Sequence, residues 1–238
     1  MNWFSSMFST VVGKKILMAL TGLFLISFLV IHAYINLNVL FTNGEENFNR
    51  AAHFMGTNLL IRILEIGLFA GFIAHIYQGF VLEYYNRTRR TAKYAVSPGN
   101  ATSTWYSRSM GLFGTLILLF LIIHIIHFWV PSRFGGLQEF TTSDGIHMHN
   151  LYLRMDEIFN QEWVVALYVA ACISLGWHLL HGFHSAFQTM GWNSPKFGPS
   201  IKTIGIGFSV LIPLLFALMP IFMYFNWEID LKGLTLFF

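Results

Sequence analysis

Five long runs of apolar residues, separated by polar segments, form the main pattern along the chain. A run of about 20 apolar residues is long enough to cross the hydrocarbon layer of a membrane as an α-helix. Each of the five runs reaches this length, so the pattern predicts five transmembrane helices. Their expected bounds are about residues 15–41, 58–84, 109–130, 163–187 and 203–225. The connection between the third and fourth runs is the longest, and it has room for a short surface helix.

Composition supports a membrane protein with one domain over residues 1–238. Hydrophobic residues make up 55% of the 238 positions and charged residues only 11%, which is a composition typical of membrane proteins rather than of soluble ones. The single cysteine, Cys172, lies inside an apolar run. It excludes a disulfide framework, and the sequence has no C-x-x-C-H motif for covalent haem attachment.

The distribution of lysine and arginine predicts the orientation, because these residues are retained on the cytoplasmic side. Nine of the 14 basic residues fall on one face if the N-terminus is cytoplasmic. They are Lys14, Lys15, Arg87, Arg89, Arg90, Lys93, Arg108, Lys196 and Lys202. Such a basic face suits a soluble partner or anionic lipid, although it also has a plain topogenic explanation. The basic residues do not form a groove with aromatic residues, so nucleic acid is not an expected partner.

Histidines occur in four of the five predicted helices, and ionisable groups inside a membrane are costly and usually functional. With a rise of about 1.5 Å per residue, His32 and His124 fall in the outer half of the membrane. His75 and His178 fall in the inner half. The four histidines therefore form two pairs at two depths.

The sequence around the histidines gives the same pairing. The outer pair shares the contexts FLVIH (residues 28–32) and FLIIH (residues 120–124). The inner pair lies in GFIAHIYQGF (residues 71–80) and SLGWHLLHGF (residues 174–183), each with a small residue four positions before the histidine. A small residue one turn away on the same face leaves room for a flat macrocycle.

One histidine from each of two helices is the arrangement that binds a haem iron through two axial imidazoles. Two pairs therefore predict two haems. An alternative is that each histidine is bonded to a backbone carbonyl or to a neighbouring helix. A zinc or copper site is a weaker alternative, because pairs at separate depths cannot close a tetrahedral site. Neighbouring histidines that do not match the paired contexts are expected to be secondary: His127, His181 and His184.

Four segments of the chain resemble a known family. They are GKKILMALTG (residues 13–22), GEENFNRAAHFM (residues 44–55), SRSMGLFGTLILLFLIIHIIHFW (residues 107–129) and HLLHGFHSAFQTMGWN (residues 178–193). The chain resembles the single-chain, five-helix cytochrome b membrane anchor of succinate:quinone oxidoreductases, the succinate dehydrogenases and fumarate reductases of complex II. The resemblance covers nearly the whole chain from Gly13 to about Asn193, and all four paired histidines match the haem ligands of the family.

The resemblance implies an all-α integral membrane protein, with a four-helix haem-binding bundle and a peripheral fifth helix. It implies two haem b groups: a proximal one bound by His75 and His178, and a distal one bound by His32 and His124. The implied location is the bacterial inner membrane, and the implied partners are a flavoprotein subunit and an iron–sulfur subunit on the cytoplasmic face. The chain would carry electrons to membrane quinone, with menaquinone expected, and would have no site for the dicarboxylate.

The resemblance also has implications for proton transfer. Some fumarate reductases of this type carry a glutamate, implicated in proton transfer, two residues before the fourth ligand, whereas this chain has Gly176 there. That departure argues against the same proton path. Quinone reduction needs two protons with two electrons, and the resemblance favours Glu46 in the first outer loop as the residue that transfers them. Alternatively, Glu46 and Arg50 form only a surface ion pair.

Two other functions are open at this stage. One is the cytochrome b subunit of another quinone-linked dehydrogenase, of the formate dehydrogenase or hydrogenase type. The other is a transporter that uses its histidines as a proton or metal relay. Visible absorption separates transport from electron transfer, and the subunits that co-purify separate the two dehydrogenase types.

Overall fold

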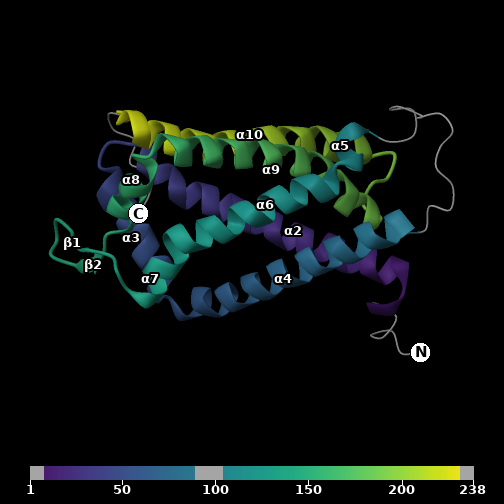
Figure 1. The fold of residues 1–238 in the computed structure, drawn as a ribbon, viewed down its shortest axis with the longest axis horizontal. Helices are drawn as coiled ribbons and strands as arrows, with labels where there is room; N and C mark the ends of the chain where they lie inside the picture. Colours follow the sequence, from purple (N-terminus) through teal and green to yellow (C-terminus); the bar gives the residue numbers. More distant parts are fainter. Residues whose placement is uncertain (1–7, 89–103, 231–238) are drawn as a thin grey trace. The chain divides into compact units, whose positions relative to one another are not determined.

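A computed structural model describes residues 8–88 and 104–230 (Figure 1). Five of its helical segments are long and apolar enough to cross a membrane, which confirms a multi-pass membrane chain. They are α2 (Val11–Asn36) with the 3-10 turn η1 (Leu37–Leu40); α4 (Leu59–Thr88); α6 (Met110–His124) with the π-helical turn η2 (Ile125–Trp129) and α7 (Val130–Phe134); α9 (Glu162–Thr189); and α10 (Gly198–Phe225). Helix α10 starts earlier than predicted, because Pro199 suits the first turn of a helix.

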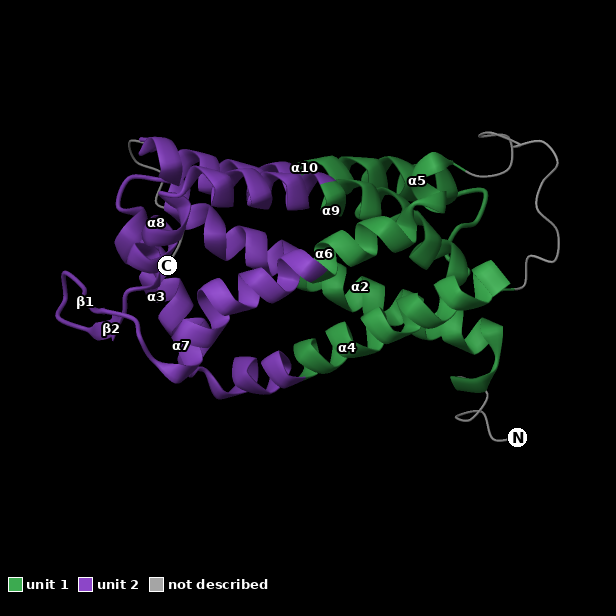
Figure 2. Ribbon diagram, in the orientation of Figure 1, with its two compact units in different colours: residues 1–28, 67–118, 174–211 green, residues 29–66, 119–173, 212–238 purple. Residues whose placement is uncertain are grey.

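The chain divides into two compact units, shown in Figure 2. Unit 1 comprises residues 1–28, 67–118 and 174–211, and unit 2 comprises residues 29–66, 119–173 and 212–238. Each of the five long helices contributes one portion to each unit. His75 and His178 belong to unit 1, whereas His32 and His124 belong to unit 2.

Unit 2 has a buried apolar core that includes the fifth span. The core combines residues of η1, α9 and α10 with residues of two short helices, α3 (Gly44–Thr57) and α8 (Leu151–Phe159). Met219 and Met223 of α10 are buried in it. One face of α10 therefore packs against the short helices of unit 2, while Leu214 of the same helix is exposed. The expectation of a four-helix haem bundle with a peripheral fifth helix stays a prediction.

The connection between α7 and α9 contains more than the expected surface helix. Helix α8 confirms that expectation, but it is preceded by a two-stranded antiparallel sheet of β1 (Glu139–Thr141) and β2 (His147–His149). Gly145 closes the turn between the strands with a φ of 83°, a conformation that glycine adopts without strain. The segment before the third span holds a further short helix, α5 (Trp105–Arg108).

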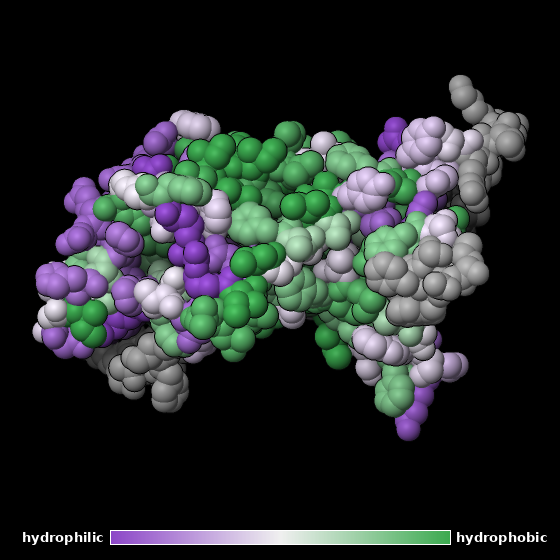
Figure 3. All heavy atoms as spheres, turned by 90° about the horizontal axis from the view of Figure 1, so that it is seen from below, coloured by the Kyte–Doolittle hydropathy of each residue, from purple (hydrophilic) through white to green (hydrophobic). Residues whose placement is uncertain are grey.

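The outer surface of α4 is apolar over most of its length. Leu59, Ile66 and Ile73 are among its most exposed side chains, and the face drawn in Figure 3 is largely hydrophobic over the middle of the long helices. Exposed apolar surface of this extent is unfavourable in water. It is suited to contact with lipid.

Candidate functional site

The inner histidine pair lies within unit 1. His75 comes from α4 and His178 from α9, and the centroids of their rings are 6.3 Å apart, with an angle of 67° between the ring planes. The Thr21 hydroxyl donates to the Leu17 carbonyl and lies 3.2 Å from Nδ1 of His75. With the hydroxyl proton on the Leu17 carbonyl, the Thr21 oxygen can accept from Nδ1–H of His75, and that tautomer leaves the lone pair of Nε2 for a metal.

Glycines of two other helices lie beside this pair. A Cβ atom at Gly22 of α2 would be 3.4 Å from Cε1 of His75, and one at Gly114 of α6 would be 3.7 Å from Cε1 of His178. The sequence instead suggested Gly71 as a source of space, but Gly71 faces the Phe24 ring, at 3.1 Å from such a Cβ. The space beside each imidazole thus comes from a helix other than its own.

Unit 1 also contains buried polar atoms without a hydrogen-bond partner. Among the described residues these are Oε1 of Gln78, Nδ1 of His178 and Nδ1 of His184. Gln78 is 4% exposed and is the one buried residue of α4. Buried polar groups are almost always paired, and an unpaired one costs about 1–3 kcal/mol. Within a membrane span, a bound polar or metal-containing group is the natural source of such partners.

The outer pair lies within unit 2 and has an aromatic environment. The ring centroids of His32 and His124 are 5.8 Å apart, and the ring planes are 86° apart. Phe216 lies 5.5 Å from His32. Rings of α6, η2 and α9 surround His124, namely Phe120, Phe128 and Tyr168. Nδ1 of His124 is buried and has no partner among the described residues.

Both pairs have dimensions that suit an iron between two imidazoles. With a metal–nitrogen bond of about 2.0 Å on each side, and a ring centre about 1.1 Å behind each nitrogen, two axial ligands have centroids about 6.2 Å apart. The observed separations are 6.3 Å and 5.8 Å. Over the described residues, no group of three or more His, Cys, Asp and Glu side chains could hold a metal ion. The donor set therefore fits haem better than zinc, and the ligand roles stay predictions.

His127 takes part in a separate contact beside the outer pair. It lies in the π-helical turn η2, its Nδ1 is 3.0 Å from the Tyr168 hydroxyl, and the two rings stack with an angle of 4°. Arg154 donates to the His127 carbonyl at 3.2 Å. Single π-helical turns are frequent at functional sites. His127 thus has a partner of its own, and the sequence offered no signal for either the turn or Tyr168.

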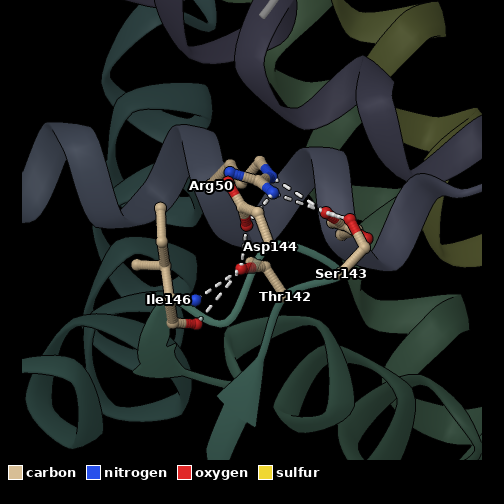
Figure 4. A network of polar contacts seen from close by, with 6 residues as sticks. Arg50, Thr142, Ser143, Asp144 and Ile146 are labelled. Carbon is tan, nitrogen blue, oxygen red and sulfur yellow. Dashed lines mark hydrogen bonds and ion pairs between the residues drawn. The ribbon is translucent and has the colours of Figure 1, made fainter.

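Glu46 belongs to a polar network between α3 and the turn of the β-hairpin. Figure 4 shows this network with Arg50, Ser143 and Asp144 labelled. Arg50 donates to Glu46 at 2.7 Å and to Asp144 at 2.5 Å, and the Ser143 hydroxyl donates to Glu46 at 2.9 Å. The surface pair of Glu46 with Arg50 is therefore present. Hydrogen bonds from Arg50 and Ser143 lower the pKa of Glu46, so the carboxyl group is ionised near neutral pH and carries no proton to donate. Its role in quinone chemistry stays a prediction.

A second carboxylate of unit 2 is more shielded. The Glu65 side chain is 16% exposed and pairs with Arg133 at 3.0 Å and with Arg62 at 2.9 Å. The indole nitrogen of Trp129 also donates to Glu65, at 2.5 Å. The partners Trp129 and Arg133 lie more than sixty positions from Glu65 in sequence, so no local pattern indicated them.

Comparison of the chain with protein-family models, with curated proteins and with solved structures finds no match. The likeness to cytochrome b anchors therefore rests on the four sequence segments and on the paired histidines. The geometry of the two pairs is independent of that likeness, because it follows from the ring positions alone.

Proposed function

We propose that this chain is the cytochrome b membrane anchor of a succinate:quinone oxidoreductase. The observation that carries the proposal is the pairing of imidazoles within each unit, at 6.3 Å and 5.8 Å between ring centroids. In each pair the two histidines come from different membrane-spanning helices. Few cofactors other than haem use two such imidazoles without further protein ligands.

The chain's own residues would hold and shield the two haems. His75 and His178 would bind the inner haem, and His32 and His124 would bind the outer one. Each haem, when bound, would carry one electron at a time. Thr21 fixes the ring orientation of His75, and Gly22 and Gly114 keep space beside the inner ligands. The aromatic rings around His124 exclude water from the outer site. No dicarboxylate site is part of the proposal.

The soluble partners are assigned to the cytoplasmic face. An iron–sulfur subunit there delivers electrons from a flavoprotein subunit, and the basic residues of that face provide a docking charge. In the described chain these are Lys14, Lys15, Arg87, Arg108, Lys196 and Lys202, whereas Arg89, Arg90 and Lys93 lie outside the described residues. The N-terminus is then cytoplasmic, and the membrane is the bacterial inner membrane.

Quinone, with menaquinone expected, would react at the opposite face, where Glu46 and Glu65 lie. Quinone reduction takes up two protons with two electrons, so a carboxylate near the ring is useful. Glu46 is the assigned residue, supported by its place in the first outer loop. Glu65 is the alternative, supported by its greater shielding and its contacts with Trp129 and Arg133.

The test compares two activities of the intact complex. Purification should yield a flavoprotein and an iron–sulfur protein together with the chain, and succinate should reduce both a quinone and an artificial acceptor that bypasses the membrane anchor. The Glu46→Gln variant should keep the second activity and both haems but lose the quinone reaction by tenfold or more, about 1.4 kcal/mol. The same two activities are measured in Glu65→Gln, which tests the alternative carboxylate.

The possible results separate the alternatives for the quinone site, for the type of dehydrogenase and for electron transfer itself. An unchanged activity ratio in Glu46→Gln with a lowered ratio in Glu65→Gln moves the quinone site to Glu65. Co-purification of formate dehydrogenase or hydrogenase subunits replaces the succinate assignment with the other dehydrogenase type. A folded complex without haem rejects electron transfer altogether.

A further inference from the structure

The end of α9 and the beginning of α10 form an apolar groove in unit 1. Its volume is about 550 Å³, and it is open to the surroundings of the chain. The lining includes Phe187, Trp192, Phe197, Ser200, Ile201 and Ile204. None of these residues takes part in the histidine pair of the same unit.

The groove carries exposed aromatic side chains at the ends of two membrane-spanning helices. Trp192 is 52% exposed and Phe197 is 57% exposed, and the Trp192 ring is 5.6 Å from that of Phe187. Aromatic residues gather at the membrane–water boundary, where their apolar rings reach into the acyl region. The groove therefore opens where lipid headgroups meet acyl chains.

Positive charge lies beside the groove without a compensating acid. The Nζ atom of Lys196 lies 5.4 Å from the centroid of the Phe197 ring. Lys202 follows Ile201 on α10, on a face of the helix that does not line the groove. Both lysines are exposed, and neither forms a salt bridge with another described residue. The sequence has no Asp or Glu between Glu162 and Glu228. The charge of this segment is therefore available to an anion from outside the chain.

We propose that the groove binds one anionic phospholipid. An acyl chain lies along Trp192, Phe197 and Ile204, and the headgroup phosphate contacts Lys196. A free phosphate would leave the apolar lining exposed, and a neutral lipid would leave Lys196 without a counter-charge. Basic pockets between transmembrane helices are a known mode of anionic lipid recognition. The proposal does not depend on haem. It assigns Lys196, one of the basic residues of the proposed cytoplasmic face, to lipid rather than to the soluble subunits.

The test is native mass spectrometry of the full complex in detergent, with added phosphatidylglycerol or phosphatidylcholine. The natural chain should retain phosphatidylglycerol in preference to phosphatidylcholine. Each lysine near an anionic headgroup contributes roughly a fivefold gain in affinity, so Lys196→Gln should lose about fivefold. Lys202→Gln, which removes an exposed lysine of α10 from a face that does not line the groove, should leave lipid retention unchanged.

A second pair of variants separates the groove from the charges. Ser200→Trp fills the groove and keeps both lysines, so it should abolish retention of phosphatidylglycerol. Thr203→Trp adds the same side chain to an exposed position of α10 that does not line the groove, and it should retain the lipid. Equal retention of the two lipids by the natural chain, or full retention by either Lys196→Gln or Ser200→Trp, would overturn the proposal. Thermal unfolding of each variant verifies that the chain is folded.

Discussion

Units 1 and 2 each contain one histidine pair, but the surroundings of the two pairs differ. In unit 1, the glycines Gly22 and Gly114 lie beside the imidazoles, and Gln78 and His184 bring unpaired polar atoms into the interior. In unit 2, aromatic rings enclose His124, and that histidine carries the one unpaired buried polar atom among the described residues of the unit. Groups around a metal ligand tune the metal. The same ligand chemistry is therefore expected to give two haems with different potentials.

The largest effect should follow removal of a ligand from one unit. His178→Ala leaves the inner iron with an open coordination position, so haem per chain should fall from two to about one, or the remaining inner haem should become high spin. His124→Ala should do the same to the outer haem alone. The measurement is haem content with low-temperature spectra of the reduced protein.

The neighbouring histidines are the controls for the ligand variants. His181→Ala and His127→Ala should both retain two low-spin haems. Loss of a haem in His181→Ala, with two haems kept in His178→Ala, would show that the assigned ligand of unit 1 is wrong.

Space beside the inner pair is the next feature to test. Gly114→Leu places a branched side chain where a Cβ alone would lie 3.7 Å from His178. We expect it to reduce inner haem content by half or more while leaving the outer haem in place. Gly207→Leu, at a position in the same unit with no atom within 4 Å of an added Cβ, should keep both haems. Equal losses in the two variants would contradict a special role for Gly114.

Substitution of Gln78 should have a smaller effect on the stability of the chain, and the sign of this effect should depend on whether haem is bound. In haem-depleted protein, Gln78→Leu removes a buried atom without a partner, so it should stabilise the chain by about 1–3 kcal/mol. In haem-loaded protein the same change should stabilise less or destabilise, because a polar contact with the cofactor is lost. Thermal unfolding of the two forms measures this difference. The exposed Gln188→Leu should show no such dependence, and an identical shift in both forms of Gln78→Leu would contradict the account.

The smallest effect concerns the pH dependence of the hairpin network in unit 2. The hydrogen bonds from Arg50 and from Thr142 lower the pKa of Asp144 to about 2. Because the folded-state pKa lies below the ordinary value of about 3.9, the stabilisation is fully present above pH 4. It is lost as pH falls from about 4 to about 2. Titration of the Asp144 carboxyl by NMR measures this midpoint, and Arg50→Gln should raise it; an ordinary midpoint with Arg50 in place would contradict the network.

The sequence predicted the five membrane spans, because length and apolar composition are sufficient to define a helix that crosses a membrane. The shared depth of His75 with His178, and of His32 with His124, followed from the same reasoning. The rings of both pairs do lie next to each other. The rise per residue of a helix was therefore sufficient to predict which histidines lie next to each other.

The surroundings of the pairs were not predictable in the same way. Gly22 and Gly114 lie far in sequence from the histidines beside them, and the contact of Tyr168 with His127 spans 41 positions. The π-helical turn, the β-hairpin and the packing of α10 into unit 2 depend on such non-local contacts. A periodic pattern records which residues face inward, but not which partners they contact.

The most direct test of the account is the haem content of the intact purified chain, together with the EPR spectrum of its oxidised form. Acid acetone should extract the haem, since the single cysteine permits no C-x-x-C-H attachment. We predict two haem b groups per chain and two distinct low-spin ferric signals, one for each histidine pair. One haem per chain, no haem in a folded complex, or a high-spin signal as the main species would contradict the two-pair arrangement.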